Sequence, residues 1–500
     1  MGQGTAHSRV TSRPREVRWT VALVLIAGVA ATVRFYRLGA ESLWLDEATS
    51  LFLAKMDLRE MIGWTAADVH PPLYYTLLHV WLRFGTSEAA LRSLSAMSGL
   101  LTVAVVYGIG RLLFDRATGS LAALLLALSP FHLWYSQEAR MYALVTLLAT
   151  CSVYCLLEVL RSGRRFAWIG YVLCTSLSLY THYYAIFVLL FQDCFVAYLC
   201  LTDPERRGML RGWIVAQAVV LMCFSPWLPT FVGQAQGGGG GWVERSVGSP
   251  SVDALLHTAM AYTTGMVRSW YPALVRRGAY LLFWACAAVG LLTARDRKPR
   301  LSSLTGSEAL GFAAAYLMLP LAMAWVVSQW KPMYALRYLL PFLPPYLLLV
   351  ARGAISIRGG WVRGGVIALL VLTQVVGVCI NASEEQNPDW RGVAEYVVTR
   401  ARPGDVVMFS PGWNVKPFDY YAQGAVDVYG DTPVPVPEEE IDEVLEEPLR
   451  DHGRLWLIHE PGHYTDPEGQ LEEALDARFA RLDSGEFRGV GSIVLYEIGE

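Results

Sequence analysis

The sequence predicts a mainly α-helical protein that crosses a membrane about eleven times and ends in a small α/β domain. Three observations support this fold class. Of the 500 residues, 54% are hydrophobic and only 17% are charged, whereas soluble domains carry about 25% charged residues. Apolar runs long enough to cross a bilayer recur as far as residue 381. The residues after that point are hydrophilic and alternate between strand-like and helix-like patterns.

The predicted spans follow a short N-terminal tail, 1–18, that is polar and basic and is placed in the cytoplasm. Each span approaches the roughly 20 residues that a bilayer requires. They are 19–38, 89–113, 118–136, 140–160, 166–184, 185–201, 212–231, 277–294, 308–328, 338–351 and 364–381. Together they form a transmembrane module, 19–383, whose first loop outside the membrane is 39–88.

Short basic loops set the orientation of these spans. They are 111–119, 161–165, 203–211, 295–300 and 352–365. With the N-terminus inside, all of them lie on the cytoplasmic side, as the positive-inside rule requires. This arrangement needs the apolar segment 70–84 not to span. The segment is only about 15 residues long and has two prolines near its start, so it is predicted to be a helix lying on the outer face.

The C-terminal region, 384–500, is predicted to be a small α/β domain outside the membrane. Asp389 is suited to cap a helix that runs through Thr399. Short apolar runs predict strands, and a longer pattern predicts a helix. The strands are 406–410, 454–460 and 492–498, and the helix is 468–482. A packing lid without catalysis is the simplest interpretation of this domain, since a fold does not dictate a function.

Composition and loops set further limits. The net charge is −3 and no basic stripe with interleaved aromatic residues is present, so nucleic acid is not an expected partner. The 8 Cys residues all lie in apolar segments and form no C-x-x-C pair, which predicts small core residues rather than disulfides or metal ligands. The Gly-rich stretch 237–241 is expected to be a flexible loop.

An acidic pair shortly after the first span is the strongest candidate for chemistry. Asp46 and Glu47 lie in the stretch RFYRLGAESLWLDEATS, close to the outer membrane face. Carboxylates at that depth are costly unless they are paired or functional. One of the two is predicted to be a general base that takes a proton from an attacking hydroxyl, while the other positions a partner. The alternative is a pair of helix-end charges satisfied by Arg34 or Arg37.

A second candidate group lies at the turn between the spans 118–136 and 140–160. Arg140 has the forked guanidinium that binds phosphate oxygens. Glu138, two residues earlier, is suited to bind a metal or to orient an acceptor. The alternative interpretation is that Glu138 and Arg140 form a local ion pair that closes the turn. Their functional interpretation requires an anion to be held near the acidic pair Asp46–Glu47.

Histidine and tyrosine side chains provide further candidates on the same face of the membrane. His70 and Tyr74 open the predicted surface helix, which is suited to line a groove for an acyl or isoprenoid chain. His70 is also a candidate metal ligand, although a lone His is more often only hydrogen-bonded. His182 and Tyr183, in the cluster THYY, are candidate substrate contacts. An interfacial aromatic belt is the alternative for that cluster.

Cations near the outer ends of two further spans complete the set. Lys331, Arg337 and Tyr338 lie in KPMYALRYLLPFLPP, and Arg92 lies near the start of the second span. Positive side chains beside an acidic pair suit a phosphate leaving group. The alternative is that they extend to lipid headgroups. Under the predicted topology, all of these candidates lie on the same side of the membrane.

Several of these blocks together resemble a known superfamily. The blocks are RFYRLGAESLWLDEATS (34–50), HPPLYYTLLHVWLRFGTSEAALRSLSAMSGLLTV (70–103), ALSPFHLWYSQEARMYAL (127–144) and RYLLPFLPP (337–345). In their order and spacing the chain resembles the GT-C superfamily of integral-membrane glycosyltransferases. It is most similar to family 39, which includes bacterial relatives of the dolichyl-phosphate-mannose-protein mannosyltransferases and of the lipid A aminoarabinose transferase.

The resemblance implies a polyprenyl-phosphate-linked sugar as donor and catalysis on the extracytoplasmic face of the plasma (inner) membrane. It also implies that Asp46 is the general base or a carboxylate that orients the acceptor, and that the anomeric carbon is inverted. Some members of the superfamily use a divalent metal ion and others do not, so the cofactor stays open. The C-terminal domain does not resemble the β-trefoil of eukaryotic protein mannosyltransferases. The acceptor is therefore left open among a cell-envelope glycan, a glycolipid and a protein.

A transporter or flippase of a lipid-linked saccharide is the alternative function. Transporters place polar residues inside their spans near the midplane and often contain inverted repeats. Few spans here carry a charge near their centre, and the exceptions, such as Glu158 and Asp193, lie near predicted inner ends or need a shifted span. No internal repeat is visible. These observations favour an enzyme.

Overall fold

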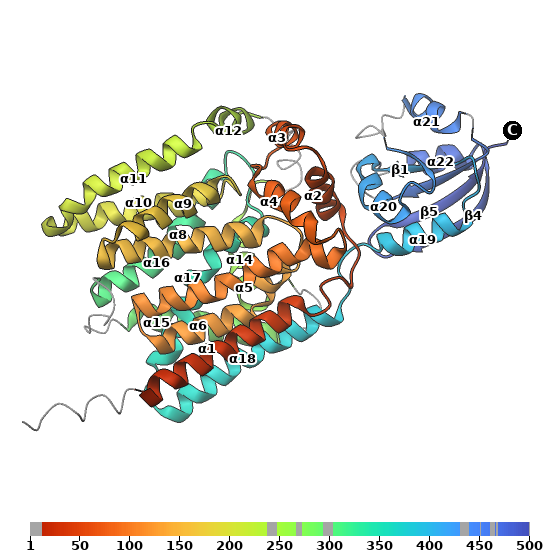
Figure 1. Ribbon diagram of the computed structural model, residues 1–500. Helices are drawn as coiled ribbons and strands as arrows, with labels where there is room; N and C mark the ends of the chain where they lie inside the picture. Colours follow the sequence, from red (N-terminus) through yellow and green to blue (C-terminus); the bar gives the residue numbers. More distant parts are fainter. Residues whose placement is uncertain are drawn as a thin grey trace, which may run out of the picture. The chain divides into compact units, whose positions relative to one another are not determined.

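The computed structural model describes residues 13–237, 248–266, 273–293, 304–430, 440–450, 452–460, 466 and 469–499. The predicted Gly-rich loop therefore lies outside the described residues, apart from Gly237. The chain forms two compact units (Figure 1). The helical unit comprises Met1–Leu38, Asp57–Trp81 and Arg92–Glu384. The α/β unit comprises Gly39–Met56, Leu82–Leu91 and Glu385–Glu500.

The helical unit is built from long apolar helices joined by short turns. Its helices are α1 (Arg13–Phe35), α3 (Leu58–Ala67), α4 (Leu73–Trp81), α5 (Glu88–Leu113, which begins in the α/β unit), α6 (Arg116–Leu128), α7 (Pro130–Ser136), α8 (Tyr142–Ser162), α9 (Arg165–Leu179), α10 (Ala185–Thr202), α11 (Met209–Phe224), α12 (Leu228–Ala235), α14 (Val252–Thr264), α15 (Ala273–Leu292), α16 (Gly306–Val327), α17 (Leu343–Ser356) and α18 (Gly360–Ser383). Short 3-10 turns precede α11 and α17, at Pro204–Gly208 and Leu336–Phe342.

Among the described residues, nine helical segments are long and apolar enough to cross a membrane, and the bent pair α6–α7 brings the number to ten. The predicted multi-spanning architecture is thus confirmed. The predicted span 118–136 is this bent pair, broken by 60° where Ser129 caps α7 and Pro130 begins it. The predicted span 166–184 corresponds to α9, which has only 15 residues, fewer than the roughly 20 that a bilayer needs. The predicted surface helix is α4, only 9 residues long.

Glycines let two central helices of this unit approach closely. A Cβ atom on Gly353 of α17 would lie 1.7 Å from the carbonyl oxygen of Cys286 on α15, and one on Gly290 would lie 2.3 Å from the carbonyl oxygen of Leu349. Any side chain at either glycine would push the two backbones apart. Such contacts between small residues replace the hydrophobic effect as the source of helix association inside a membrane.

The α/β unit contains a mixed sheet with helices on both faces. Its strands are β1 (Asp405–Ser410), β2 (Asp427–Tyr429), β3 (Arg454–His459), β4 (Ala480–Phe487) and β5 (Gly491–Glu497), and its helices are α2 (Leu45–Lys55), α19 (Trp390–Arg400), α20 (Val415–Ala422), α21 (Ile441–Leu449) and α22 (Gln470–Asp476). In the described part the strand order is β2-β1-β3-β5-β4. The strand β1 is parallel to β2 and β3, whereas β5 is antiparallel to β3 and β4.

The predicted strands 406–410, 454–460 and 492–498 correspond to β1, β3 and β5 within one residue at each end. The predicted helix 468–482 was wrong in its second half. The helix α22 ends at Asp476, and β4 begins at Ala480. The helical pattern of that segment is overridden because β4 pairs along its length with β5.

A buried ion pair anchors the start of the sheet. Asp405 accepts two hydrogen bonds from Arg454, at 2.9 and 2.6 Å, and one from the indole N–H of Trp456 at 3.0 Å. Burial raises the pKa of Asp405, but the hydrogen bond from Arg454 and further donors outweigh it and hold the pKa below its usual value. This carboxylate therefore ties β1 to β3 while ionised.

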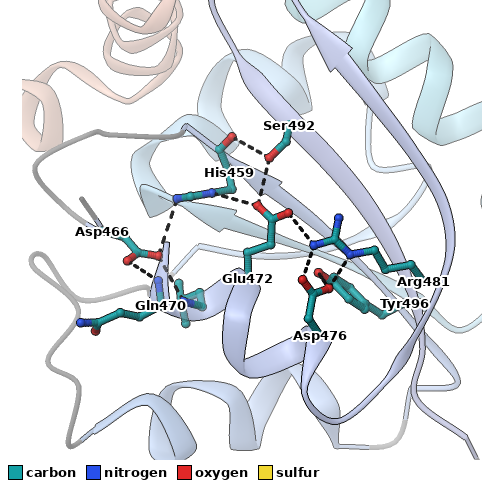
Figure 2. Close-up of polar contacts among 9 residues, drawn as sticks. His459, Asp466, Gln470, Glu472, Asp476, Arg481, Ser492 and Tyr496 are labelled. Atoms are coloured by element: carbon teal, nitrogen blue, oxygen red, sulfur yellow. Dashed lines mark hydrogen bonds and ion pairs between the residues drawn. The ribbon is translucent and has the colours of Figure 1, made fainter. Parts of the chain in front are cut away.

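A polar network lies on the other face of the sheet, at the end of β3 (Figure 2). His459, the last residue of β3, lies 3.4 Å from a carboxylate oxygen of Glu472 and 3.6 Å from one of Asp466. The guanidinium of Arg481, on β4, forms ion pairs with both Glu472 and Asp476, and its distance to the Glu472 carboxylate is 2.8 Å. These contacts fasten α22 to the strands, next to the apolar cluster that α22 forms with the same face of the sheet.

Candidate active site

Several of the predicted site residues of the helical unit gather around His182. His182 is 5% exposed and lies in the turn between α9 and α10. Its ring centroid is 4.7 Å from that of Tyr338, 5.9 Å from that of His70 and 6.1 Å from that of Tyr142. Adding the two arginines whose charges act on His182 defines the His182 cluster. Its members are His70, Arg140, Tyr142, His182, Arg337 and Tyr338.

Hydrogen bonds between short segments bring this cluster together. The N–H of Leu73, at the start of α4, donates to the carbonyl of Tyr180 at 3.0 Å, which holds α4 against the turn that carries His182. The hydroxyls of Tyr74 and Ser95 are 3.3 Å apart, and Ser95 also donates to the carbonyl of Arg140 at 3.0 Å. Tyr74 therefore links α4 to α5 and, through α5, to the turn before α8.

Arg140 is almost completely enclosed, with 3% of its surface exposed. It donates to the hydroxyl of Tyr75 at 3.5 Å, and its guanidinium carbon lies 5.9 Å from the ring centre of Tyr142. Glu138, which is 7% exposed, accepts the N–H of Arg140 through its carbonyl at 2.8 Å. The turn between α7 and α8 thus holds a buried arginine and a buried glutamate two residues apart.

The cluster is electrostatically positive around a neutral histidine. Burial first, and then the charges of His70, Arg140 and Arg337, lower the pKa of His182 well below its ordinary value. The N–H of Tyr184 donates to Nδ1 of His182 at 3.2 Å, so in the neutral ring Nε2 carries the proton. His182 is therefore a neutral N–H donor set among cations, an arrangement suited to an anion.

The depressed pKa of His182 predicts a pH-dependent stability. Below about pH 6.5 the unfolded chain takes up a proton at this histidine while the folded chain does not, so stability falls as the pH falls, by roughly 1.4 kcal/mol per pH unit. Thermal unfolding between pH 7.5 and 5.5 should therefore depend less steeply on pH in His182→Gln. His257→Gln, an exposed histidine on α14, should keep the wild-type slope. An equal slope in all three proteins would contradict the assignment.

Asp68 is a candidate site residue that the sequence analysis missed. It follows α3 directly, and its carboxylate accepts a hydrogen bond from Nδ1 of His70 at 3.3 Å. Burial raises the pKa of Asp68, but the hydrogen bond and charge of His70, with a smaller effect of Arg140, outweigh it and lower the pKa. The signal that would have found it is the spacing D-x-H-P-P, in which a carboxylate precedes a histidine fixed by prolines.

Replacing Asp68 tests whether it positions His70. Asp68→Asn removes the ionised acceptor, and a hydrogen bond to a charged group is typically worth about 1.5–3 kcal/mol. We expect activity at this site to fall roughly 10-fold or more, with part of the loss restored by Asp68→Glu and with a shifted pH profile. Asp57→Asn, at the other end of α3, is the matched control, because Asp57 only caps the helix and Asn caps equally well. Equal activity of both variants would remove Asp68 from the site.

Three other predicted residues make main-chain or neighbouring side-chain contacts. Lys331 donates to the carbonyls of Gln234 and Ala235, at 3.1 and 2.8 Å, and so neutralises the negative end of α12. Arg92 donates to the carbonyl of Leu38 at 3.0 Å. The hydroxyl of Tyr183 binds both Gln234 and Trp227. Burial, opposed by the Trp227 hydrogen bond and aided by the charge of Asp68, raises the pKa of Tyr183 to about 12.

The acidic pair lies in the α/β unit, in the first turn of α2. Asp46 is half-buried, and its carbonyl accepts the hydroxyl of Ser50 at 2.9 Å. Glu47 is fully buried. Carboxylates in this position are favoured by the positive end of the helix dipole. The two adjacent acids thus differ in access to solvent, as expected if only one of them meets a substrate.

No group of three or more His, Cys, Asp or Glu side chains within the described residues is arranged to hold a metal ion. Among the described residues, the side chains therefore do not fit a metal centre built from three such protein ligands. The structure therefore does not change the earlier conclusion that the use of a divalent ion as a cofactor is open.

Comparison with known proteins agrees with the predicted resemblance. Residues 69–229 match the family model described as dolichyl-phosphate-mannose-protein mannosyltransferase. No curated protein matches the chain. In fold, the chain is similar to ArnT from Cupriavidus metallidurans bound to undecaprenyl phosphate, with 14% identity, 95% of this chain and 98% of that chain covered, and a TM-score of 0.62.

Two archaeal structures are similar as well. The oligosaccharyltransferase from Archaeoglobus fulgidus in complex with Zn and sulfate has 13% identity, covers 96% of this chain and 73% of its own, and gives a TM-score of 0.58. AglB from the same organism, in complex with an inhibitory peptide and a dolichol-phosphate, has 12% identity. The match covers 96% of this chain and 74% of that chain, with a TM-score of 0.57. The family match contains His70, Arg140 and His182, so most of the cluster lies in the segment that carries the resemblance.

Proposed function

We propose that this chain, which resembles the GT-C membrane glycosyltransferases in its family match and in its fold, transfers a sugar from a polyprenyl-phosphate donor to a hydroxyl acceptor. The reaction takes place on the extracytoplasmic face of the plasma (inner) membrane. The observation that carries the proposal is the buried, positively charged His182 cluster, which lies mainly within the segment matched by the family model. ArnT bound to undecaprenyl phosphate and AglB bound to a dolichol-phosphate share the fold and bind this class of lipid.

The His182 cluster would hold the phosphate of the donor. Arg140 and Arg337 supply guanidinium groups, which bind phosphate oxygens through paired hydrogen bonds. His182 adds the N–H on Nε2, and His70, oriented by Asp68, adds a second imidazole. Because these donors are fixed by packing before the substrate arrives, they stabilise the charge that develops on the leaving phosphate without further reorganisation.

Asp46 would act as the general base. It takes the proton of the acceptor hydroxyl as the oxygen attacks the anomeric carbon from the face opposite the phosphate. One bond forms between that oxygen and the anomeric carbon, and the bond from the same carbon to the phosphate oxygen breaks. The products are the glycosylated acceptor with inverted configuration, the polyprenyl phosphate, and a proton on Asp46. Glu47, which is buried beside it, would position the base or its partner.

The remaining predicted residues would contact the substrates around this centre. Tyr74 would line the groove for the isoprenoid chain, and Glu138 would orient the acceptor. The other substrate contacts are Arg92, Tyr183, Lys331 and Tyr338. The acceptor class is left as a cell-envelope glycan, a glycolipid or a protein, because neither the fold nor the side chains distinguish these.

A transfer assay with purified protein in nanodiscs tests the proposal. A panel of radiolabelled polyprenyl-phosphate hexoses and pentoses is offered with an extract of envelope acceptors, with and without a chelator. We expect label from one donor to enter an acceptor fraction, and the chelator arm decides whether a metal is needed. Tight donor binding without any transfer would favour the transporter or flippase instead.

A further inference from the structure

A small cavity lies between α5 and α8, at the C-terminal end of both helices. Its volume is about 160 Å³. It is lined by Gly108, Arg111, Leu112, Tyr154, Glu158 and Arg161. Both helices end in the short basic loops that the topology places in the cytoplasm, so this cavity is distinct from the His182 cluster, whose histidines and Arg140 come from turns at the other ends of the helices.

One wall of the cavity is organised by a chain of contacts. A Cβ atom on Gly108 would lie 2.8 Å from the ring of Tyr154, so glycine is needed for this ring to pack against α5. The Tyr154 hydroxyl donates to Glu158 at 3.4 Å. Glu158 in turn holds Arg161 through contacts of 3.0 and 2.8 Å. Arg161 is thereby fixed at the rim with its charge balanced by Glu158.

Arg111, on the opposite wall, has no such partner. Its Nε is buried and makes no hydrogen bond in the described part of the chain. A buried donor of this kind costs free energy unless a ligand satisfies it, more so when the donor is charged. With Arg111 and Arg161 positive and Glu158 negative, the lining carries one net positive charge, and that charge is on the arginine left unpaired.

We propose that this cavity binds the phosphate of an anionic phospholipid headgroup in the cytoplasmic leaflet. The cavity is smaller than the roughly 300–1,000 Å³ of pockets that enclose drug-sized ligands, so it suits a headgroup whose acyl chains remain in the bilayer. Anionic lipids are attracted to basic segments at this surface, and basic pockets between spanning helices are known sites for their headgroups. The proposal does not depend on the transferase activity, which is placed on the other face.

Lipid-dependent stabilisation of the purified full-length chain tests this site. Thermal unfolding in detergent is followed while phosphatidylglycerol, phosphatidylcholine or inorganic phosphate is added in separate series. A ligand that binds only the folded state raises the unfolding temperature with its concentration, which yields an apparent dissociation constant. Arg111→Gln removes the unpaired guanidinium. Arg164→Gln removes the same charge from an exposed position in the loop after α8 and is the matched control.

We expect phosphatidylglycerol, and not phosphatidylcholine, to stabilise the wild type and Arg164→Gln alike, with an apparent affinity at least roughly 10-fold weaker in Arg111→Gln. Arg111→Lys keeps the charge but loses the forked guanidinium, so its apparent affinity for phosphatidylglycerol should lie between those of the wild type and Arg111→Gln. This variant replaces Arg111→Gln in the test if the glutamine variant does not fold. Equal responses of Arg111→Gln and Arg164→Gln would overturn the site. Full stabilisation by inorganic phosphate without a response to phosphatidylglycerol would overturn the lipid as its source.

Discussion

Replacing Asp46 by Asn is expected to lower sugar transfer by about 10²- to 10⁴-fold, the usual contribution of a general base. The change keeps the size and shape of the side chain but removes its ability to take a proton. Because Asp46 is only half-buried and lies in the first turn of α2, where Asn is tolerated, folding should be preserved. Initial rates of transfer with the donor identified in the panel assay measure the effect.

Donor binding separates a loss of chemistry from a loss of structure. Asp46→Asn should bind the polyprenyl-phosphate sugar with nearly unchanged affinity, because the phosphate contacts are assigned to the His182 cluster. Asp253→Asn is the matched control, since Asp253 is an exposed acid in the first turn of another helix, α14, and its activity should equal that of the wild type. Full transfer by Asp46→Asn would refute the base assignment, and Glu47→Gln would then be the next variant to measure.

The helical architecture was predictable because the length of an apolar run is a local property. The observed helices differ from the predicted spans where packing or a proline, and not hydropathy, determines where a helix ends. The segment 118–136 is apolar throughout, yet Pro130 lacks an N–H and starts a new helix at an angle of 60°. The segment 166–184 is also apolar, but its helix stops at Leu179, and the turn that follows carries His182. A candidate site residue therefore lies where hydropathy alone predicted a continuous span.

The C-terminal domain was predicted in class but not in every element. Residues 480–482, the end of the predicted helix 468–482, instead begin β4, which pairs with β5 apart from one irregularity between Arg481 and Asp483. The strands β4 and β5 are joined by the short turn 488–490, so cross-strand packing decides their conformation against the helical preference of the segment. The strand β2, with only 3 residues, is too short for any periodicity to reveal.

For the candidate site, sequence reasoning selected residues that are unusual in their surroundings. A histidine or an arginine beside a membrane is conspicuous, and the structure brings His70, Arg140 and His182 into one cluster. Asp68 was missed because an acid at a helix end normally has an ordinary explanation in capping or solvation. Its role became visible only through its contact with His70. The catalytic roles of Asp46 and Glu47 stay predictions that the Asp46 experiment decides.

Replacing Arg140 by Ala is expected to lower kcat/KM for the lipid-linked donor by roughly 10- to 150-fold, because a hydrogen bond to a charged group contributes about 1.5–3 kcal/mol. The effect should appear mainly in the KM for the donor if Arg140 holds the phosphate equally in the ground and transition states, and in kcat if it acts on the leaving phosphate. Steady-state kinetics with varied donor distinguish these cases.

Two further variants make the Arg140 result interpretable. Arg140 is almost fully buried, so part of any loss in Arg140→Ala could reflect disturbed packing beside Tyr75 and Tyr142. Arg140→Lys keeps the charge but cannot form a forked contact, and an activity between those of alanine and wild type would indicate that geometry as well as charge matters. Arg211→Ala, an exposed arginine on α11, should behave as the wild type. If well-folded Arg140→Ala retained wild-type kinetics, Arg140 would be a structural residue of the turn between α7 and α8, and the phosphate would have to be held by Arg337 and the two histidines.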